Sequence, residues 1–171
     1  MIPARAFHGR LRAGYCLLVA LLLAAPAQPE VPKRSAEAVG PRMLEGQTRA
    51  SVERDYLLAW QSLGRALSEN RPDLLNEYFV GLAKDKLADT IREQQKYGIQ
   101  TIYSEPTHDF TVVFYSPDGL SIQFVDSVEY RLEVRDHGRA VGSGEVRSRY
   151  VSVMTPTETK WKVRILQAEP Q

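Results

Sequence analysis

The chain has almost none of the residues from which disulfide frameworks and metal sites are built. Its 171 residues include one cysteine, Cys16, and three histidines, His8, His108 and His137. A single cysteine excludes an internal disulfide, and the histidines lack the paired spacing of metal ligands. We therefore expect neither a metal nor a bound cofactor.

An excess of one charge and the common catalytic motifs are missing as well. Lys and Arg number 22 against 21 Asp and Glu, so no basic field points to nucleic acid and no acidic excess points to disorder. The sequence contains no G-x-S-x-G, Walker, Rossmann or H-E-x-x-H pattern. What remains is an ordinary globular composition, enough for one compact domain.

The first thirty residues have the order of a secretory signal. Three arginines precede an uncharged, leucine-rich stretch over residues 13–27, and Ala25-Pro26-Ala27 fits an A-x-A cleavage site. The stretch is shorter than the roughly 20 apolar residues of a spanning helix. We interpret residues 1–27 as a cleaved signal peptide, with an uncleaved membrane anchor or a buried helix as the alternatives. The protein is then extracytoplasmic, either secreted or periplasmic, and membrane-anchored if the segment is retained.

The next part of the chain changes from an irregular stretch to a helical pattern. Residues 28–50 contain several prolines and glycines without periodicity, which predicts a flexible linker. Ser51 can cap a helix, and apolar residues then recur at helical spacing: Tyr56, Trp60, Leu63 and Leu67. Gly64 lies on the same side of this helix, where it suggests a close contact with another element.

Two further helices and a run of strands are predicted after this first helix. A short helix has Pro72 in its first turn, and a third covers about residues 82–97, ended by Gly98. Period-two alternation then predicts strands over residues 99–104, 110–115, 120–135, 141–154 and 160–168. In the last strand Trp161, Val163 and Ile165 should share the packed face. Helices followed by strands predict an α+β fold, with N-terminal helices packed on a curved antiparallel sheet.

This order of elements resembles the nuclear transport factor 2-like superfamily, which is also called cystatin-like and includes ketosteroid-isomerase-like proteins. The resemblance covers about residues 51–168 and is carried by three stretches: Tyr56-Leu57-Leu58-Ala59-Trp60, Asn70-Arg71-Pro72-Asp73-Leu74 and Lys160-Trp161-Lys162-Val163-Arg164-Ile165. It implies a cone with a pocket between sheet and helices. Some members are isomerases, dehydratases or cyclases, whereas others are non-catalytic modules for assembly, so the fold does not decide the function.

Asp126 is the most informative polar position. On the strand over residues 120–135 it shares a face with apolar residues, so alternation directs its carboxylate toward the core. A buried carboxylate must be neutral, paired or in a wet cavity, and a carboxyl group in such an environment can act as a general base or acid. The alternatives are a bulge that turns Asp126 outward, an ion pair with an arginine, or a hydrogen bond from a backbone amide.

Other candidates could accompany Asp126 in the cone. His108 could exchange protons, although turn chemistry after Pro106 would also explain it. Tyr115 and Tyr130 could donate hydrogen bonds to an oxyanion, or they could be core aromatics. The predicted pocket lining is aromatic: Tyr103, Phe124, Trp60 and Trp161.

Three functions follow from these observations. The first is a non-enzymatic extracytoplasmic module that binds a protein partner or a small apolar ligand, with a homodimer through the sheet among the options. The second is a small-molecule isomerase, dehydratase or cyclase with Asp126 as general base. The third is a membrane-anchored accessory subunit of a cell-envelope complex, which requires that residues 1–27 are retained.

Overall fold

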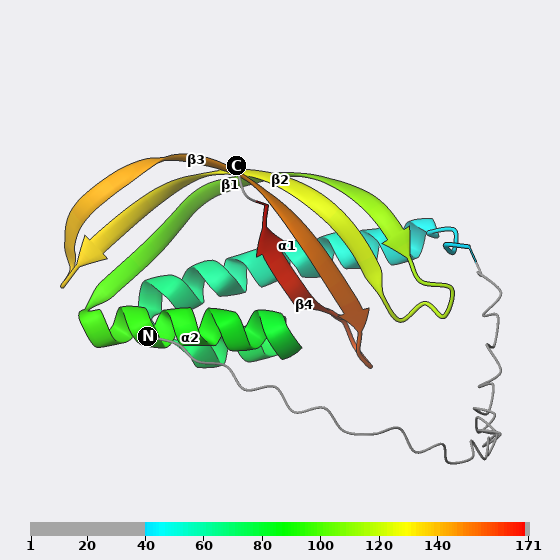
Figure 1. Cartoon of the computed structure of the whole chain (residues 1–171), viewed down its shortest axis with the longest axis horizontal. Helices are drawn as coiled ribbons and strands as arrows, with labels where there is room; N and C mark the ends of the chain where they lie inside the picture. The colour runs from blue at the N-terminus through cyan, green and yellow to red at the C-terminus, as the bar shows by residue number, and fades with distance from the viewer. Residues whose placement is uncertain (1–39, 170–171) are drawn as a thin grey trace, which may run out of the picture. The chain divides into compact units, whose positions relative to one another are not determined.

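The computed structural model describes residues 40–169, and the predicted signal peptide and most of the predicted linker lie outside this range. The described elements follow one another as α1 (Gly46–Glu69), η1 (Pro72–Glu77), α2 (Gly81–Tyr97), β1 (Ile99–Tyr115), β2 (Ile122–Asp136), β3 (Arg139–Pro156) and β4 (Trp161–Ala168). Helices precede strands, which confirms the α+β prediction (Figure 1). Among the helices within residues 40–169, none is long and apolar enough to cross a membrane.

Helix α1 begins earlier than the sequence predicted. It starts at Gly46, with Glu45 as the N-cap residue, so the assignment of Ser51 as the cap is wrong. The predicted apolar stripe is correct, because Tyr56, Trp60 and Leu67 are all buried. The helix ends at Glu69, and the following residue, Asn70, adopts the left-handed conformation of a C-cap.

The second and third predicted helices differ in their regularity. The second is a short 3-10 helix, η1, and its Leu75 is fully buried. The third, α2, ends at Tyr97, and Gly98 caps it in the left-handed conformation, as the sequence indicated. Ala88 and Ile91 of α2 pack into the same core as α1.

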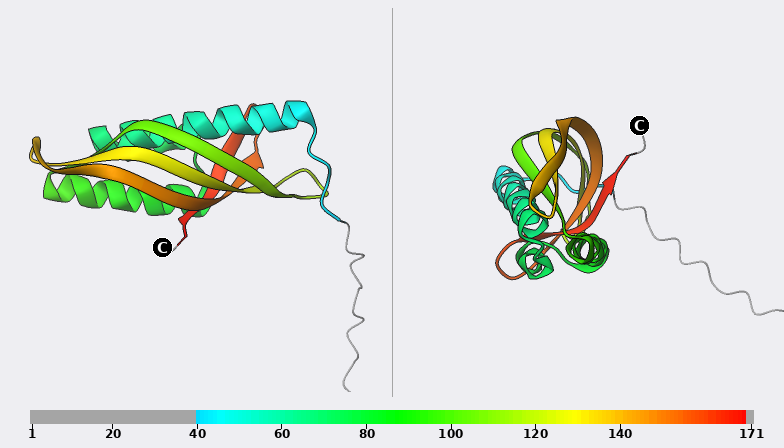
Figure 2. Two further views of the ribbon diagram at one scale, coloured as in Figure 1. Left: turned by 90° about the horizontal axis from the view of Figure 1, so that it is seen from above. Right: turned by 90° about the vertical axis from the view of Figure 1, so that its left-hand side faces the viewer.

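The four strands form one antiparallel sheet in the order β1-β2-β3-β4. The sheet arches over α1 and α2, which both lie on its concave side (Figures 1 and 2). β1 and β4 are therefore the edge strands. At the β4 edge, Val163 exchanges backbone hydrogen bonds with Tyr78 and Val80, which follow η1.

A bulge makes β1 one long strand where two were predicted. The pairing with β2 shifts between Ser104 and Thr107, and Glu105 has a φ of 53°. The extra residue lets β1 continue past Pro106, which a regular ladder would not accommodate.

A second bulge corrects the predicted face of β4. The pairing with β3 shifts at Val153/Met154, where Met154 pairs with Val163 and Val153 pairs with Ile165. Arg164 is the extra residue, so Ile165 turns to the outer face of the sheet. Leu166 packs against the core in its place.

Candidate functional site

Asp126 lies on the inner face of β2 and is completely buried. Its neighbours at two-residue spacing, Phe124 and Val128, are buried on the same face. In the sheet it pairs with Phe110 of β1 and Tyr150 of β3. The inward direction expected from alternation is therefore what the structure shows.

His108 is the direct partner of Asp126. Its Nδ1 lies 2.9 Å from Oδ2 of the carboxylate, and the imidazole side chain is only 7% exposed. The second carboxylate oxygen, Oδ1, has no hydrogen-bond partner among residues 40–169. A carboxylate that orients an imidazole in this way is chemically able to support proton transfer, provided that a substrate can reach it.

Two aromatic side chains of α1 cover this pair. The ring centroids of Trp60 and Tyr56 lie 5.2 Å and 5.9 Å from that of His108. The Tyr56 hydroxyl lies 3.2 Å from Oγ of Ser152 on β3. Burial, followed by the negative charge of Asp126, raises the pKa of Tyr56 far above its usual value.

A cluster of three tyrosines fills the cone next to Trp60. The rings of Tyr103 and Tyr130 lie 4.8 Å apart, and the ring of Tyr150 lies 5.3 Å from that of Trp60. Burial, together with the nearby Tyr130, raises the pKa of Tyr103 to about 12. Burial and the hydrogen bond with Tyr130 raise the pKa of Tyr150 as well. Sequence reasoning missed Tyr150, although its position opposite Asp126 follows once the hairpin register is known.

The structure does not bring Tyr115 and Trp161 to the Asp126 pair. They contact each other where β1 ends and β4 begins, with ring centroids 6.4 Å apart, and the Arg42 guanidinium lies 5.6 Å from the Tyr115 ring centroid. Phe124 is buried against Tyr56 in the core. Of the predicted pocket residues, Trp60 and Tyr103 line the cavity described next.

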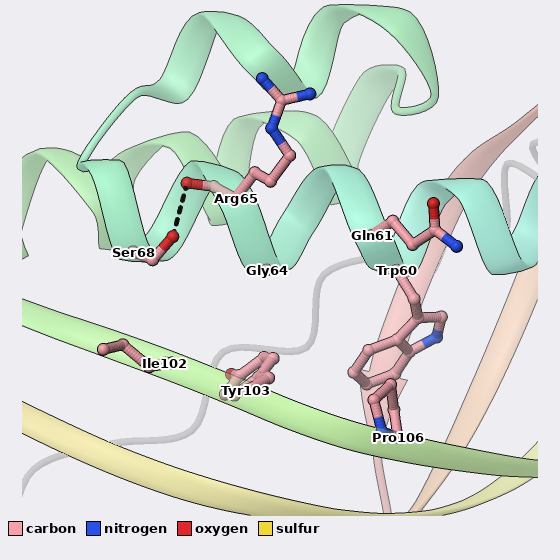
Figure 3. A pocket seen from close by; sticks show the side chains of 8 residues that line it. All are labelled: Trp60, Gln61, Gly64, Arg65, Ser68, Ile102, Tyr103 and Pro106. Atoms are coloured by element: carbon pink, nitrogen blue, oxygen red, sulfur yellow. Dashed lines mark hydrogen bonds between the residues drawn. The ribbon is translucent and has the colours of Figure 1, made fainter.

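This cavity of about 340 Å³ lies between α1 and β1, and we call it the α1/β1 pocket. Its lining residues are Trp60, Gln61, Gly64, Arg65, Ser68, Ile102, Tyr103 and Pro106. Trp60 projects from α1 toward β1, whereas Arg65 turns its guanidinium away from the strand (Figure 3). The walls that remain are mainly apolar and aromatic, as in many ligand sites.

Gly64 has the opposite role from the one that the sequence suggested. A Cβ atom at this position would meet no heavy atom within 4 Å, so the glycine marks open space and no close contact. A larger side chain at this position would enter the α1/β1 pocket, because Gly64 lines it.

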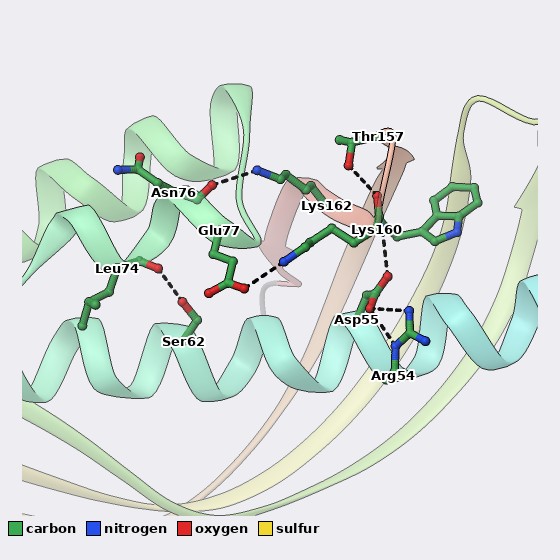
Figure 4. A network of polar contacts seen from close by, with 10 residues as sticks. Arg54, Asp55, Ser62, Leu74, Asn76, Glu77, Thr157, Lys160 and Lys162 are labelled. Atoms are coloured by element: carbon green, nitrogen blue, oxygen red, sulfur yellow. Dashed lines mark hydrogen bonds and ion pairs between the residues drawn. The ribbon is translucent and has the colours of Figure 1, made fainter.

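A second buried acid, Asp55, has a structural environment. Its Oδ2 accepts a hydrogen bond of 2.8 Å from the backbone N–H of Trp161, and its Oδ1 lies 2.9 Å from the Arg54 guanidinium (Figure 4). Nearby, Lys160 forms an ion pair with Glu77, with Nζ 2.8 Å from Oε1. These contacts fasten α1 and η1 to the start of β4. Within residues 40–169, no cluster of three or more metal-ligating side chains occurs.

Comparison with known proteins finds similarity at the level of structure alone. No family model matches the chain, and a search of curated proteins finds no match. Among solved structures, the intermembrane space region of the chloroplast protein ARC6 is 15% identical, with a TM-score of 0.60, over 77% of this chain and 100% of that region. A putative scytalone dehydratase from Novosphingobium aromaticivorans is 14% identical, with a TM-score of 0.51, over 74% of this chain and 89% of that one.

The chain has the nuclear transport factor 2-like fold. A hexachlorocyclohexane dehydrochlorinase shares it at 11% identity and a TM-score of 0.50, covering 71% of this chain and 86% of its own. Two of these three proteins are thus named for a reaction, and the ARC6 region is not. The nuclear transport factor 2-like fold therefore leaves the function of this chain to be argued from its own residues.

Proposed function

We propose that this protein is a non-enzymatic binding module that holds an apolar group in the α1/β1 pocket. One observation carries the proposal: the groups suited to chemistry are buried, and the open cavity lies elsewhere. Trp60 contacts His108 on one side and lines the pocket on the other, so it separates the Asp126 pair from the cavity. A ligand in the pocket would meet aromatic and apolar walls, without meeting the carboxylate.

The proposal includes the compartment that the sequence indicates. We propose export by residues 1–27 and cleavage after Ala27, which yields a secreted or periplasmic module. Amino-terminal sequencing of the exported protein should begin at Gln28. An intact Met1 would instead favour the membrane-anchored accessory subunit.

The binding function is tested by filling the pocket from Gly64. We expect flat aromatic fragments, such as naphthalene and indole derivatives, to give saturation-transfer NMR signals with the full-length chain. Gly64→Leu should remove these signals, because the leucine occupies the cavity. Gly46→Leu is the matched control, since this glycine lies in the same helix, has open space around it and is remote from the pocket lining. Signals that survive Gly64→Leu would contradict the proposal.

A second candidate function rests on the 2.9 Å contact between His108 and Asp126. An isomerase, dehydratase or cyclase could use this pair as its general base if Trp60 moved aside on substrate binding. Such a base would catalyse hydrogen–deuterium exchange at the acidic C–H of an enolisable cyclic ketone. We expect no exchange above background with the wild-type chain. Exchange that Asp126→Asn abolishes, with folding unchanged, would favour the enzyme.

A further inference from the structure

The edge strand β1 has backbone hydrogen-bonding groups beside the α1/β1 pocket that find no partner among residues 40–169. The carbonyl of Gly98 accepts a hydrogen bond from His137 at the end of β2, whereas the carbonyl of Ile99 accepts one of 2.8 Å from the Asn70 side chain of α1's cap. Ile99 therefore points its carbonyl away from β2. Because these directions alternate along an antiparallel strand, the N–H and C=O groups of Thr101 and Tyr103 also point away from β2.

Beside the pocket, the regular stretch of this edge is short and has clear ends. At one end, Asn70 occupies the carbonyl of Ile99. At the other, Glu105 has a φ of 53° and Pro106 has no N–H, so the regular edge stops there. Between these two limits, the regular edge beside the pocket runs from Thr101 to Ser104.

The pocket opens along this same stretch. Ile102, Tyr103 and Pro106 supply its β1 wall. The Gln100 side chain donates a 2.9 Å hydrogen bond to the carbonyl of Ser68, which ties the end of α1 to the start of β1. Nearer the middle of α1, the ring of Trp60 packs against that of Tyr103, with the ring centroids 6.2 Å apart. These contacts hold the two elements on either side of the cavity.

We propose that an extended peptide segment binds here by adding a short strand to β1, with one bulky apolar side chain in the α1/β1 pocket. This inference rests on the proposed binding function and names the class of ligand. The unpaired N–H and C=O groups of Thr101 and Tyr103 favour a peptide over a compact small molecule, because a peptide backbone supplies both partners at strand spacing. Leucine or phenylalanine suits the aromatic walls and the volume.

The test uses a phage-displayed library of random nine-residue peptides, selected on the immobilised full-length chain. Binders should carry one large apolar residue within an extended, uncharged core. In fluorescence polarisation with the selected peptides, Gly64→Leu should weaken binding by at least about tenfold, whereas Gly46→Leu should leave it unchanged. Thermal unfolding of both variants shows that each still folds.

Backbone N-methylation distinguishes strand addition from simple pocket binding. An added strand pairs through every second residue, so N-methyl groups on one alternate set of peptide amides should abolish binding, while the other set should be tolerated. The amides of Thr101 and Tyr103 should exchange with solvent deuterium more slowly in the complex. Binding that Gly64→Leu weakens but that N-methylation does not change would contradict strand addition. It would still agree with the proposed binding module. Absence of any peptide or fragment that distinguishes Gly64→Leu from wild type would overturn both.

Discussion

Asp126 and His108 are two polar side chains that are buried in the core as partners of each other. A buried carboxylate without a partner is strongly destabilising, and the imidazole of His108 supplies that partner at 2.9 Å. Around the pair, Trp60 and the tyrosines supply polar atoms as well as apolar surface. The chemistry that these residues could perform is limited by access, because both side chains are buried.

The buried tyrosines predict a loss of stability in alkaline solution. The pKa of Tyr103 is raised from 10.0 to about 12, so folding favours its protonated form. Its contribution to stability is complete below about pH 10 and is lost as the pH rises toward 12, at up to about 1.4 kcal/mol per pH unit. Tyr103→Phe should make this fall less steep in urea unfolding between pH 8 and 11.5. Tyr97→Phe, at an exposed ring, is the control, and an unchanged slope in Tyr103→Phe would contradict the prediction.

At this scale the sequence predicted the direction of Asp126 and named His108 as a possible companion, but it did not predict the direct contact between the two. Alternation along one strand is a local rule, and it places Asp126 inward. Tyr103 and His108 are five residues apart, so a regular strand would put them on opposite faces. The bulge between Ser104 and Thr107 inserts one residue and turns His108 to the inner face. Pro106 is the local signal for that bulge, but the extent of the shift depends on the pairing with β2.

Among the elements, α1 is fixed to the sheet at several places along its length. Asn70 and Gln100 join its end to β1, Trp60 packs on the middle of the cone, and Asp55 binds the start of β4. The α1/β1 pocket lies between the first two of these attachments. A stable position of α1 is therefore a condition for the pocket.

Removal of the Asp55 carboxylate should destabilise the attachment to β4. Asp55→Ala leaves the backbone N–H of Trp161 without its partner in a buried place, which should lower the free energy of unfolding by about 2 kcal/mol. Urea denaturation measures this loss. Arg54→Ala removes only the exposed partner of the same carboxylate and should cost less than about 1 kcal/mol. Equal losses in the two variants would show that the hydrogen bond to Trp161 has little effect.

The order and kind of the elements could be predicted, whereas the bulges in β1 and β4 could not. Helical and period-two spacing are visible in single segments, so the α+β class, α2 and its Gly98 cap were predicted. The outward turn of Ile165 was not, because it depends on how β4 pairs with β3. The pocket was predicted in part, because Trp60 and Tyr103 line it. The role of Gly64 was missed for a similar reason: Gly64 opens a cavity only because β1 passes at a distance from it.

On the scale of the whole domain, the outer face of the sheet has an apolar half. The register aligns Phe114, Gln123, Val153 and Ile165 across the four strands on this face. Val125 and Val151 form the neighbouring row and are half-buried. The other half of the face carries charges, including the pair between Glu129 and Arg147.

This apolar half is where we would expect a homodimer through the sheet. Val153→Lys should shift any dimer toward monomer in sedimentation velocity, because it places a charge in the centre of the apolar rows. Ser143→Lys, an exposed position on β3 far from these rows, should have no effect. A wild-type chain that stays monomeric at high concentration, or a dimer that Val153→Lys leaves intact, would contradict the prediction.

Chemical modification of the two described histidines tests most directly whether the Asp126 pair is closed to ligands. Diethyl pyrocarbonate reacts with accessible imidazoles, and mass spectrometry of tryptic peptides separates His108 from His137. The side chain of His137 is 80% exposed and that of His108 is 7% exposed. We predict that His137 reacts at least about tenfold faster than His108 in the folded protein, because His108 reacts only through local opening. Comparable rates would show that the pair is open to solvent. That result would contradict the binding module with a closed core and would favour the enzyme.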